Sequence, residues 1–141
     1  MKKLALLLPA LSLAACTTPQ QVTHTHSEDC QVIGAIAHGQ WLSGSLSAPM
    51  RAKSFGADCD WKALGMPRPA ITNEDRPVLS FSYSPPVYSA DGKQATVNWS
   101  YGGDESAKGR PQSYFYTGSK CTAEKHGRQW QFVTCKMSFI T

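Results

Sequence analysis

The sequence predicts an α+β domain in which short N-terminal helices pack on an antiparallel sheet of four to six strands. The first observation is an apolar spacing typical of a helix between residues 32 and 41. The second is a series of strand-like segments after residue 78, separated by turns that contain Gly or Pro. The third is a set of cysteines that can staple a small domain: Cys30, Cys59, Cys121 and Cys135. A small all-β sandwich or barrel is the alternative.

Residues 1–15 have the form of a secretory signal that is removed from the mature protein. Lys2 and Lys3 supply positive charge, residues 4–13 are mostly apolar, and small residues follow. A helix that spans a bilayer needs about 20 apolar residues, so this run is too short to cross one. The segment therefore predicts export.

The end of this segment, Leu13-Ala14-Ala15-Cys16, resembles the lipobox of bacterial lipoproteins. The resemblance implies that the Cys16 thiol receives a diacylglyceryl group, that cleavage occurs before Cys16, and that acyl chains such as palmitate anchor the protein. Thr17 stands where an inner-membrane retention signal would place Asp. The resemblance therefore implies the outer membrane, with the periplasmic and surface faces both open.

This processing defines the expected domains and their charge. We expect a signal peptide at 1–15, a lipidated cysteine with a flexible tether at 16–29, and one globular domain at 30–141. Removing Lys2 and Lys3 from a formal net charge of +4 leaves +2. The remaining basic residues are scattered rather than continuous, so we do not expect a nucleic-acid partner.

The four remaining cysteines predict two disulfides, because exported domains fold in an oxidising compartment. Four cysteines allow three pairings, and we favour Cys30 with Cys59 and Cys121 with Cys135, since each pair lies within one local unit. Their spacing contains no C-x-x-C and matches no zinc pattern. In the tether, His24 and His26 lack the further fixed ligands that a metal site needs. No metal or other cofactor is predicted.

In the first half of the domain, Ser27 is expected to cap a helix. The apolar residues at helical spacing are Val32, Ile33, Ile36, Ala37 and Trp41. Gly34 and Gly39 oppose this helix, because each costs about 0.5 to 1 kcal/mol relative to Ala. The following segments are expected to be a loop at 43–49, a short strand or irregular segment at 51–56, a second short helix at 58–64 and an extended connection at 67–77.

The second half is expected to consist of strands and turns. Strands are predicted at 78–83, 87–88, 95–101, 112–117 and 121–125, with a last strand from 129. A turn at 89–93, a loop at 102–111 and a break at 118–120 separate them. If His126 pairs with Trp130 across a three-residue turn, Cys121 lies opposite Cys135. The last strand is expected either to be covered on both sides or to change face through a bulge near Thr134.

Known catalytic motifs are absent from the sequence, including the nucleophile elbow, the zinc-protease helix, the phosphate loop and the dinucleotide fingerprint. Asp58 and Asp60 flank Cys59, and His126 lies in a predicted turn. Their sequence positions do not establish a catalytic geometry, so we predict no enzymatic activity. A small envelope hydrolase is the alternative, and it requires a pocket that contains these residues.

Aromatic residues supply the predicted binding face: Trp99, Tyr101, Tyr114 and Tyr116. Such a face can stack on the sugar rings of peptidoglycan or contact an envelope protein. The alternative is that it forms the core beneath the helix. The predicted function is thus that of a membrane-anchored envelope lipoprotein with a non-catalytic binding or structural domain. One alternative form is a periplasmic inhibitor of a cell-wall hydrolase.

Overall fold

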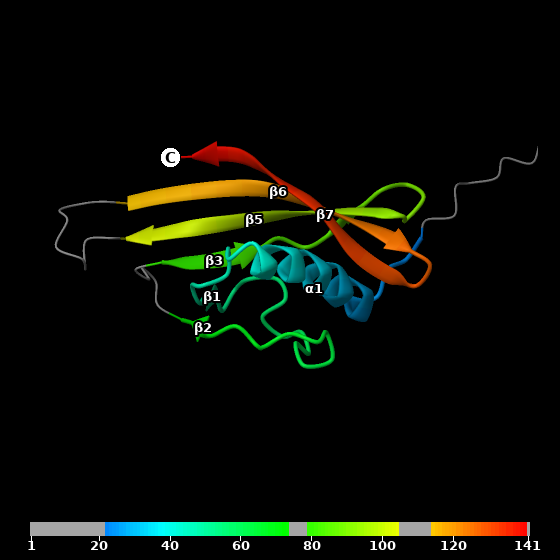
Figure 1. Ribbon diagram of the computed structural model, residues 1–141, viewed down its shortest axis with the longest axis horizontal. Coiled ribbons are helices and arrows are strands. Elements are labelled where there is room, and N and C mark those ends of the chain that lie inside the picture. The colour runs from blue at the N-terminus through cyan, green and yellow to red at the C-terminus, as the bar shows by residue number, and fades with distance from the viewer. Residues whose placement is uncertain (1–21, 74–78, 105–113, 141) are drawn as a thin grey trace, which may run out of the picture.

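The computed structural model describes residues 22–73, 79–104 and 114–140. One helix, α1, lies across one face of a seven-stranded sheet (Figure 1). The elements are α1 (His26–Leu42), β1 (Met50–Arg51), β2 (Ile71–Thr72), β3 (Ser80–Tyr83), β4 (Val87–Tyr88), β5 (Gln94–Asp104), β6 (Tyr114–His126) and β7 (Gln129–Ile140).

The strand order is β2-β1-β3-β5-β6-β7, and β4 pairs with β5 outside this path. β1 is parallel to β2 and β3, whereas the other pairs are antiparallel. The α+β class is confirmed. The described residues contain one helix rather than several, and the seven-stranded sheet is larger than the expected four to six strands.

The start of α1 is set by Thr25 rather than by the expected Ser27. The Thr25 hydroxyl accepts a hydrogen bond from the Glu28 backbone N–H at 3.2 Å. Thr25-x-x-Glu28 is the sequence pattern of a capping box, so this start could have been predicted. The folded part therefore begins before the expected boundary at Cys30. His24 already stacks on Tyr88, with ring centroids 3.4 Å apart.

Four of the five predicted apolar positions of α1 are buried: Val32, Ile33, Ile36 and Ala37. Trp41 is the exception, since 51% of it is exposed. The neighbouring Gln40 takes the buried position instead, and its side-chain oxygen accepts a hydrogen bond from the Tyr83 hydroxyl at 2.5 Å. Burial raises the pKa of Tyr83 well above its ordinary value, which keeps this hydroxyl protonated.

The two glycines of α1 allow other segments to approach the helix closely. A Cβ atom at Gly39 would lie 2.2 Å from Phe132 Cγ of β7, and one at Gly34 would lie 3.0 Å from Leu64 Cδ1. The Phe132 ring thus occupies the space that a side chain at Gly39 would need. The helix-propensity cost of Gly39 is offset by direct packing of α1 on the sheet.

Residues 52–66 form turns rather than the helix expected at 58–64. The Asp60 side chain accepts from the Ala63 backbone N–H at 3.1 Å, but only a single helical turn follows. One turn fixes several dihedrals for few hydrogen bonds, and Gly65 ends it with a φ of 72°. The Cys30–Cys59 disulfide joins this turn segment to α1, as expected.

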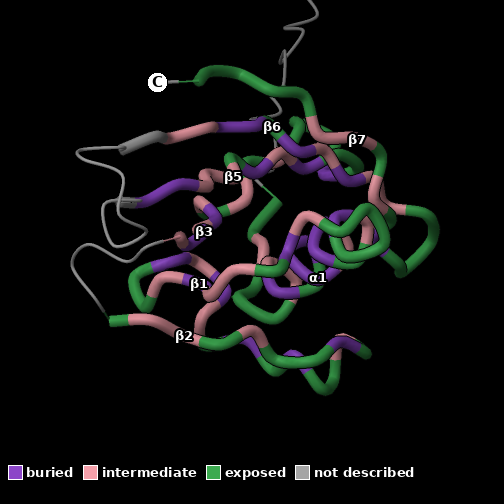
Figure 2. The backbone as a smooth tube through the Cα atoms, turned by 60° about the vertical axis from the view of Figure 1, so that its left-hand side comes forward, coloured by how far each residue is buried: buried purple, intermediate pink, exposed green. Residues whose placement is uncertain are grey.

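The hydrophobic core lies between α1, the sheet and the turn segment. Its largest fully buried side chains include Trp61, Phe81, Ile33 and Met50. The Trp61 indole donates a hydrogen bond to the Gly56 carbonyl at 3.0 Å, so the ring closes the core without an unpaired donor. Figure 2 shows the buried middle of the sheet and the exposed last part of β7.

β6 is one continuous strand, so the break expected at 118–120 is wrong. Gly118 pairs with Phe139 inside the ladder, and a Cβ at Gly118 would lie 2.1 Å from Phe139 Cε1. A glycine that suggested a strand end therefore marks a close contact instead. The predicted turn at 89–93 is confirmed, with Gly92 at a φ of 68°.

The β6–β7 hairpin differs from the expected register by one residue at its turn. His126 pairs with Gln129, not with Trp130, and Gly127 adopts a φ of 63° in the two-residue connection. A bulge at Val133, close to the predicted Thr134, restores the register further along. Cys121 and Cys135 are therefore opposite one another and form the second expected disulfide.

Candidate functional site

The strand register shows which part of the sheet α1 covers. Opposed residues of neighbouring strands point to the same face. Two such rows cross the sheet from β3 through β5 and β6 to β7 at one end of the helix-side face. The first row is Phe81, Tyr101, Thr117 and Ile140. The second row is Tyr83, Trp99, Ser119 and Met137. Gln40 of α1 reaches Tyr83 on β3, and the helix ends two residues later. The β7 ends of these rows are exposed.

We name this surface the apolar end patch, and it consists of Trp99, Tyr101, Met137 and Ile140. The rings of Trp99 and Tyr101 are stacked, with centroids 5.8 Å apart and an interplanar angle of 7°. Both are partly buried against the core. Met137 and Ile140 are 65% and 66% exposed. The patch combines a rigid aromatic pair with two exposed aliphatic side chains.

The predicted aromatic face does not form as one surface. Trp99 and Tyr101 lie together on the helix side, whereas Tyr116 pairs with Gly102 and therefore points to the opposite face. The Arg51 guanidinium lies over the Tyr116 ring, 4.9 Å from its centroid. The Tyr114 side chain lies outside the described part of the structure. Met137 and Ile140 were missed because two bulges change the face of β7.

The apolar end patch borders the outer edge of the sheet. β7 is the last strand in the sheet order, and within the described residues its outer side carries no further strand. An edge strand of this kind exposes backbone N–H and C=O groups that another chain can pair with. β7 therefore offers a partner both backbone groups for strand pairing and an adjoining apolar surface.

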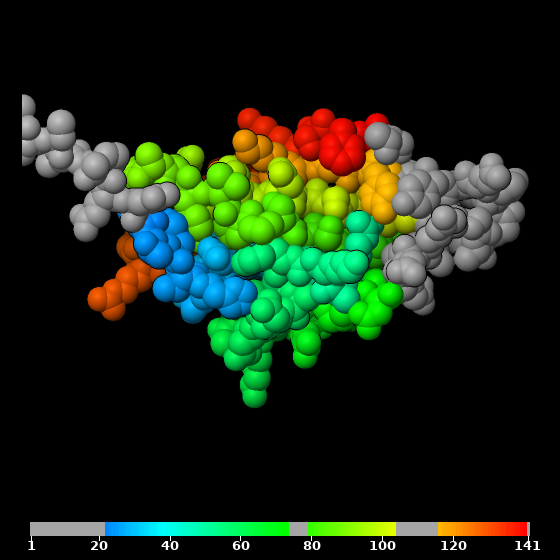
Figure 3. All heavy atoms as spheres, turned by 180° about the vertical axis from the view of Figure 1, so that it is seen from behind, coloured from blue at the N-terminus to red at the C-terminus, as the bar shows by residue number. Residues whose placement is uncertain are grey.

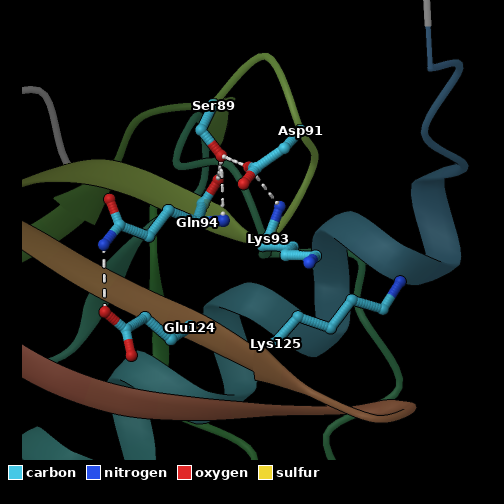
Figure 4. A pocket seen from close by; sticks show the side chains of 6 residues that line it. All are labelled: Ser89, Asp91, Lys93, Gln94, Glu124 and Lys125. Atoms are coloured by element: carbon cyan, nitrogen blue, oxygen red, sulfur yellow. Dashed lines mark hydrogen bonds between the residues drawn. The ribbon is translucent and has the colours of Figure 1, made fainter.

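A polar pocket of about 390 Å³ lies at the β4–β5 turn (Figure 4). The Asp91 carboxylate accepts from the Ser89 hydroxyl at 2.6 Å and from the Lys93 backbone N–H at 3.0 Å. These hydrogen bonds hold the pKa of Asp91 below its ordinary value. Glu124 accepts from the Gln94 amide at 2.9 Å. The polar groups of this pocket therefore build the turn and the adjoining strand pair.

An apolar pocket of about 330 Å³ lies beside the C-terminal end of α1. Its lining includes Trp41, Leu46, Trp61 and Met66, and Arg68 is the one charged residue among the described residues that line it. These lining residues include no carboxylate, histidine or cysteine. The pocket can hold an apolar group, but it supplies no side chain that is typical of general acid–base catalysis.

The two predicted tether histidines point to different partners. His24 bonds to Glu28 at 2.9 Å, whereas His26 lies 3.3 Å from Asp58 and 3.7 Å from the Cys30 sulfur. His26, Cys30 and Cys59 form a compact group. Because both sulfurs belong to a disulfide, they are not thiolates and do not fit a metal ion.

The candidate acid–base residues are not gathered in one site. Asp58 pairs with His26, Asp60 caps the turn at Ala63, and His126 lies 3.7 Å from Glu124 at the β6–β7 hairpin. Neither of the two pockets above contains Asp58, Asp60 or His126. The arrangement that a hydrolase would need is therefore not seen around these residues.

Comparison with protein-family models, curated proteins and solved structures finds no match to this chain. Within the described ranges, α1 is too short and too polar to cross a membrane.

Proposed function

We propose that this protein is a lipoprotein of the bacterial outer membrane whose domain binds another envelope protein without chemistry of its own. The lipobox-like segment ending at Cys16 supports the anchor. The observation that carries the binding role is the exposure of Met137 and Ile140, which share their rows on the sheet with the stacked pair Trp99 and Tyr101. Exposed apolar surface of this kind is typical of sites that bind other proteins.

The position of the patch favours a protein partner over the lipid bilayer. The chain enters the domain beside the β4–β5 turn, where a Cβ at Gly92 would lie 3.7 Å from Val22 Cγ1. Trp99 and Tyr101 lie further along β5, roughly 17 and 24 Å from its first residue, Gln94, at about 3.4 Å per residue. The apolar end patch is therefore at the end of the sheet remote from the anchor side.

The edge of β7 indicates how the partner binds. An extended segment of the partner would pair with the β7 backbone and place its apolar side chains on Met137 and Ile140. Trp99 and Tyr101 lie in the same two rows on β5, separated from Met137 and Ile140 by Ser119 and Thr117 of β6. Inhibition of a cell-wall hydrolase is one function that such binding could serve, and the identity of the captured protein distinguishes it from a structural role.

The test is affinity capture by the full lipidated chain from detergent-solubilised envelopes, with bound proteins quantified by mass spectrometry. We expect one stoichiometric protein with the parent chain. The double variant Met137→Ser/Ile140→Ser should reduce its capture at least about tenfold, because apolar anchors carry most of the binding energy.

Val87→Ser is the matched control, since Val87 is 67% exposed but lies on β4. This variant should capture the partner as the parent does. Equal capture by the parent and the double variant would contradict the proposed site. Retention on isolated sacculi, with no bound protein, would replace the protein partner with peptidoglycan.

A further inference from the structure

The face of the sheet opposite α1 is polar and basic. Its rows include Ser82, Ser100, Gly118 and Phe139, and next to them Asn98, Lys120 and Lys136. The hydroxyls of Ser82 and Ser100 are hydrogen-bonded at 2.7 Å. Figure 3 views the molecule from this side, with the end of β7 in red beside β6 in orange. We name this surface the back face.

Two lysines are directly opposed on the back face. Lys120 of β6 pairs with Lys136 of β7, and both side chains are exposed. Opposed residues of this kind have Cβ atoms about 4.5 to 5.5 Å apart, and like charges there destabilise a sheet. Within the described residues neither lysine has a carboxylate partner. An anion bound between them would remove this repulsion.

An aromatic ring lies one row away from the lysine pair. Phe139 covers the backbone of Gly118, where a Cβ would lie 2.1 Å from the ring, and 48% of Phe139 is exposed. Same-face neighbours on one strand are about 7 Å apart, so the Phe139 ring on Gly118 and the Lys120 side chain are close enough for one oligosaccharide to contact both. Asn98 completes the lysine row with a further polar side chain.

We propose that the back face binds an acidic glycan, with one sugar ring on Phe139 and the carboxylate or phosphate of the adjoining sugar between Lys120 and Lys136. Aromatic side chains offer apolar faces to sugar rings, and ammonium groups offer charged donors to oxyanions. Phe139 lies against Gly118 instead of projecting from the sheet, which favours a ring stacked on it over insertion into a bilayer. This site is distinct from the apolar end patch.

The probe is a polygalacturonate oligomer, with neutral dextran as its uncharged counterpart. The full lipidated chain is reconstituted in phosphatidylcholine nanodiscs, and binding is measured by calorimetry at several salt concentrations. We expect polygalacturonate to bind and dextran not to bind. Lys120→Gln/Lys136→Gln should weaken binding at least about tenfold and flatten its salt dependence, because fewer charges are then involved.

Phe139→Ser should weaken binding while the salt dependence stays unchanged. Lys62→Gln is the control for charge, because Lys62 is exposed in the turn segment, and it should bind as the parent does. The melting temperature of the double lysine variant should equal or exceed that of the parent, since a repulsive pair is removed. This readout separates lost binding from lost folding.

Three results would overturn the proposal. The first is equal polygalacturonate binding by the parent and the double lysine variant. The second is equal binding of dextran and polygalacturonate by the parent. The third is loss of polygalacturonate binding when phosphatidylglycerol is added to the nanodiscs, which would assign the back face to the anionic membrane surface.

Discussion

Glu28 joins three parts of the fold at the start of α1. Its carboxylate accepts from Lys125 of β6 at 2.5 Å and contacts His24 at 2.9 Å. The hydrogen bond from Lys125 holds the pKa of Glu28 below its ordinary value of 4.5, although partial burial opposes this shift. The Lys125 ammonium also lies 5.6 Å from the Trp130 ring centroid. The ion pair between Glu28 and Lys125 therefore connects α1 to the β6–β7 hairpin.

Glu28→Gln should therefore change how stability depends on pH. A lowered pKa in the folded state means that the stabilisation is complete above about pH 4.5 and is lost as pH falls through the lower folded value. We expect the variant to be about 1 kcal/mol less stable than the parent at pH 7, and this difference to shrink as the pH falls below 4.5.

Urea denaturation at pH values between 3 and 7 measures this difference. Glu124→Gln removes the same charge from the exposed hairpin and should produce a smaller change at pH 7, because Glu124 pairs with Gln94 at the surface. A constant difference between Glu28→Gln and the parent over the whole pH range would contradict the assigned role of Glu28.

Elements with a strong local pattern could be predicted from the sequence. The helix, the 89–93 turn and the strand with alternating residues from Ala95 to Tyr101 follow from spacing and turn chemistry. The pairing of Cys121 with Cys135 was also expected. The hairpin turn is one residue shorter than expected, and the bulge at Val133 shifts the register back so that the two cysteines are opposite one another. Local pattern and covalent constraint agree at these positions.

Elements defined by contacts distant in sequence were not predicted correctly. Gly118 suggested a break in β6 because the packing of Phe139 on it is not visible from local sequence. The candidate site was only half predicted for the same reason. Trp99 and Tyr101 were identified, but the bulges that bring Met137 and Ile140 onto the same face shift the register of β7. Tyr116 was placed on the wrong face.

The two glycines of α1 have different neighbours, so we predict opposite effects of replacing each of them with alanine. Gly39→Ala should destabilise the fold by about 1 to 3 kcal/mol, because the added methyl group overlaps the Phe132 ring. Gly34→Ala should be neutral or stabilising by up to about 1 kcal/mol, because the end of the Leu64 side chain can move and helix propensity improves.

Chemical denaturation of both variants provides the measurement. Gly34→Ala is the matched control, since it makes the same substitution in the same helix. If Gly39→Ala were as stable as the parent, the direct contact between α1 and β7 would not exist.

The surfaces of the molecule have different roles in the proposed lipoprotein. The N-terminal segment would supply the anchor, whereas α1 closes the core over most of one sheet face and the apolar end patch lies where that helix ends. The patch is remote from the β4–β5 turn, next to which the chain enters the domain. A partner in the envelope could therefore reach it while the acyl chains stay in the membrane.

The anchor can be tested separately from the binding site. Cys16→Ala should abolish acylation, because it removes the thiol that we propose accepts the diacylglyceryl group. Metabolic labelling with palmitate and fractionation of the envelope measure this outcome. Persistent palmitate labelling in the variant would exclude Cys16 as the lipidated residue.

Site-specific photocrosslinking in living cells can detect contact between the apolar end patch and another protein. A photoreactive phenylalanine analogue at Met137 should give one discrete protein adduct. The same analogue at Val87, whose exposure is similar at 67% against 65%, should give none. An adduct at Val87 without one at Met137, or no protein adduct at either position, would contradict the account.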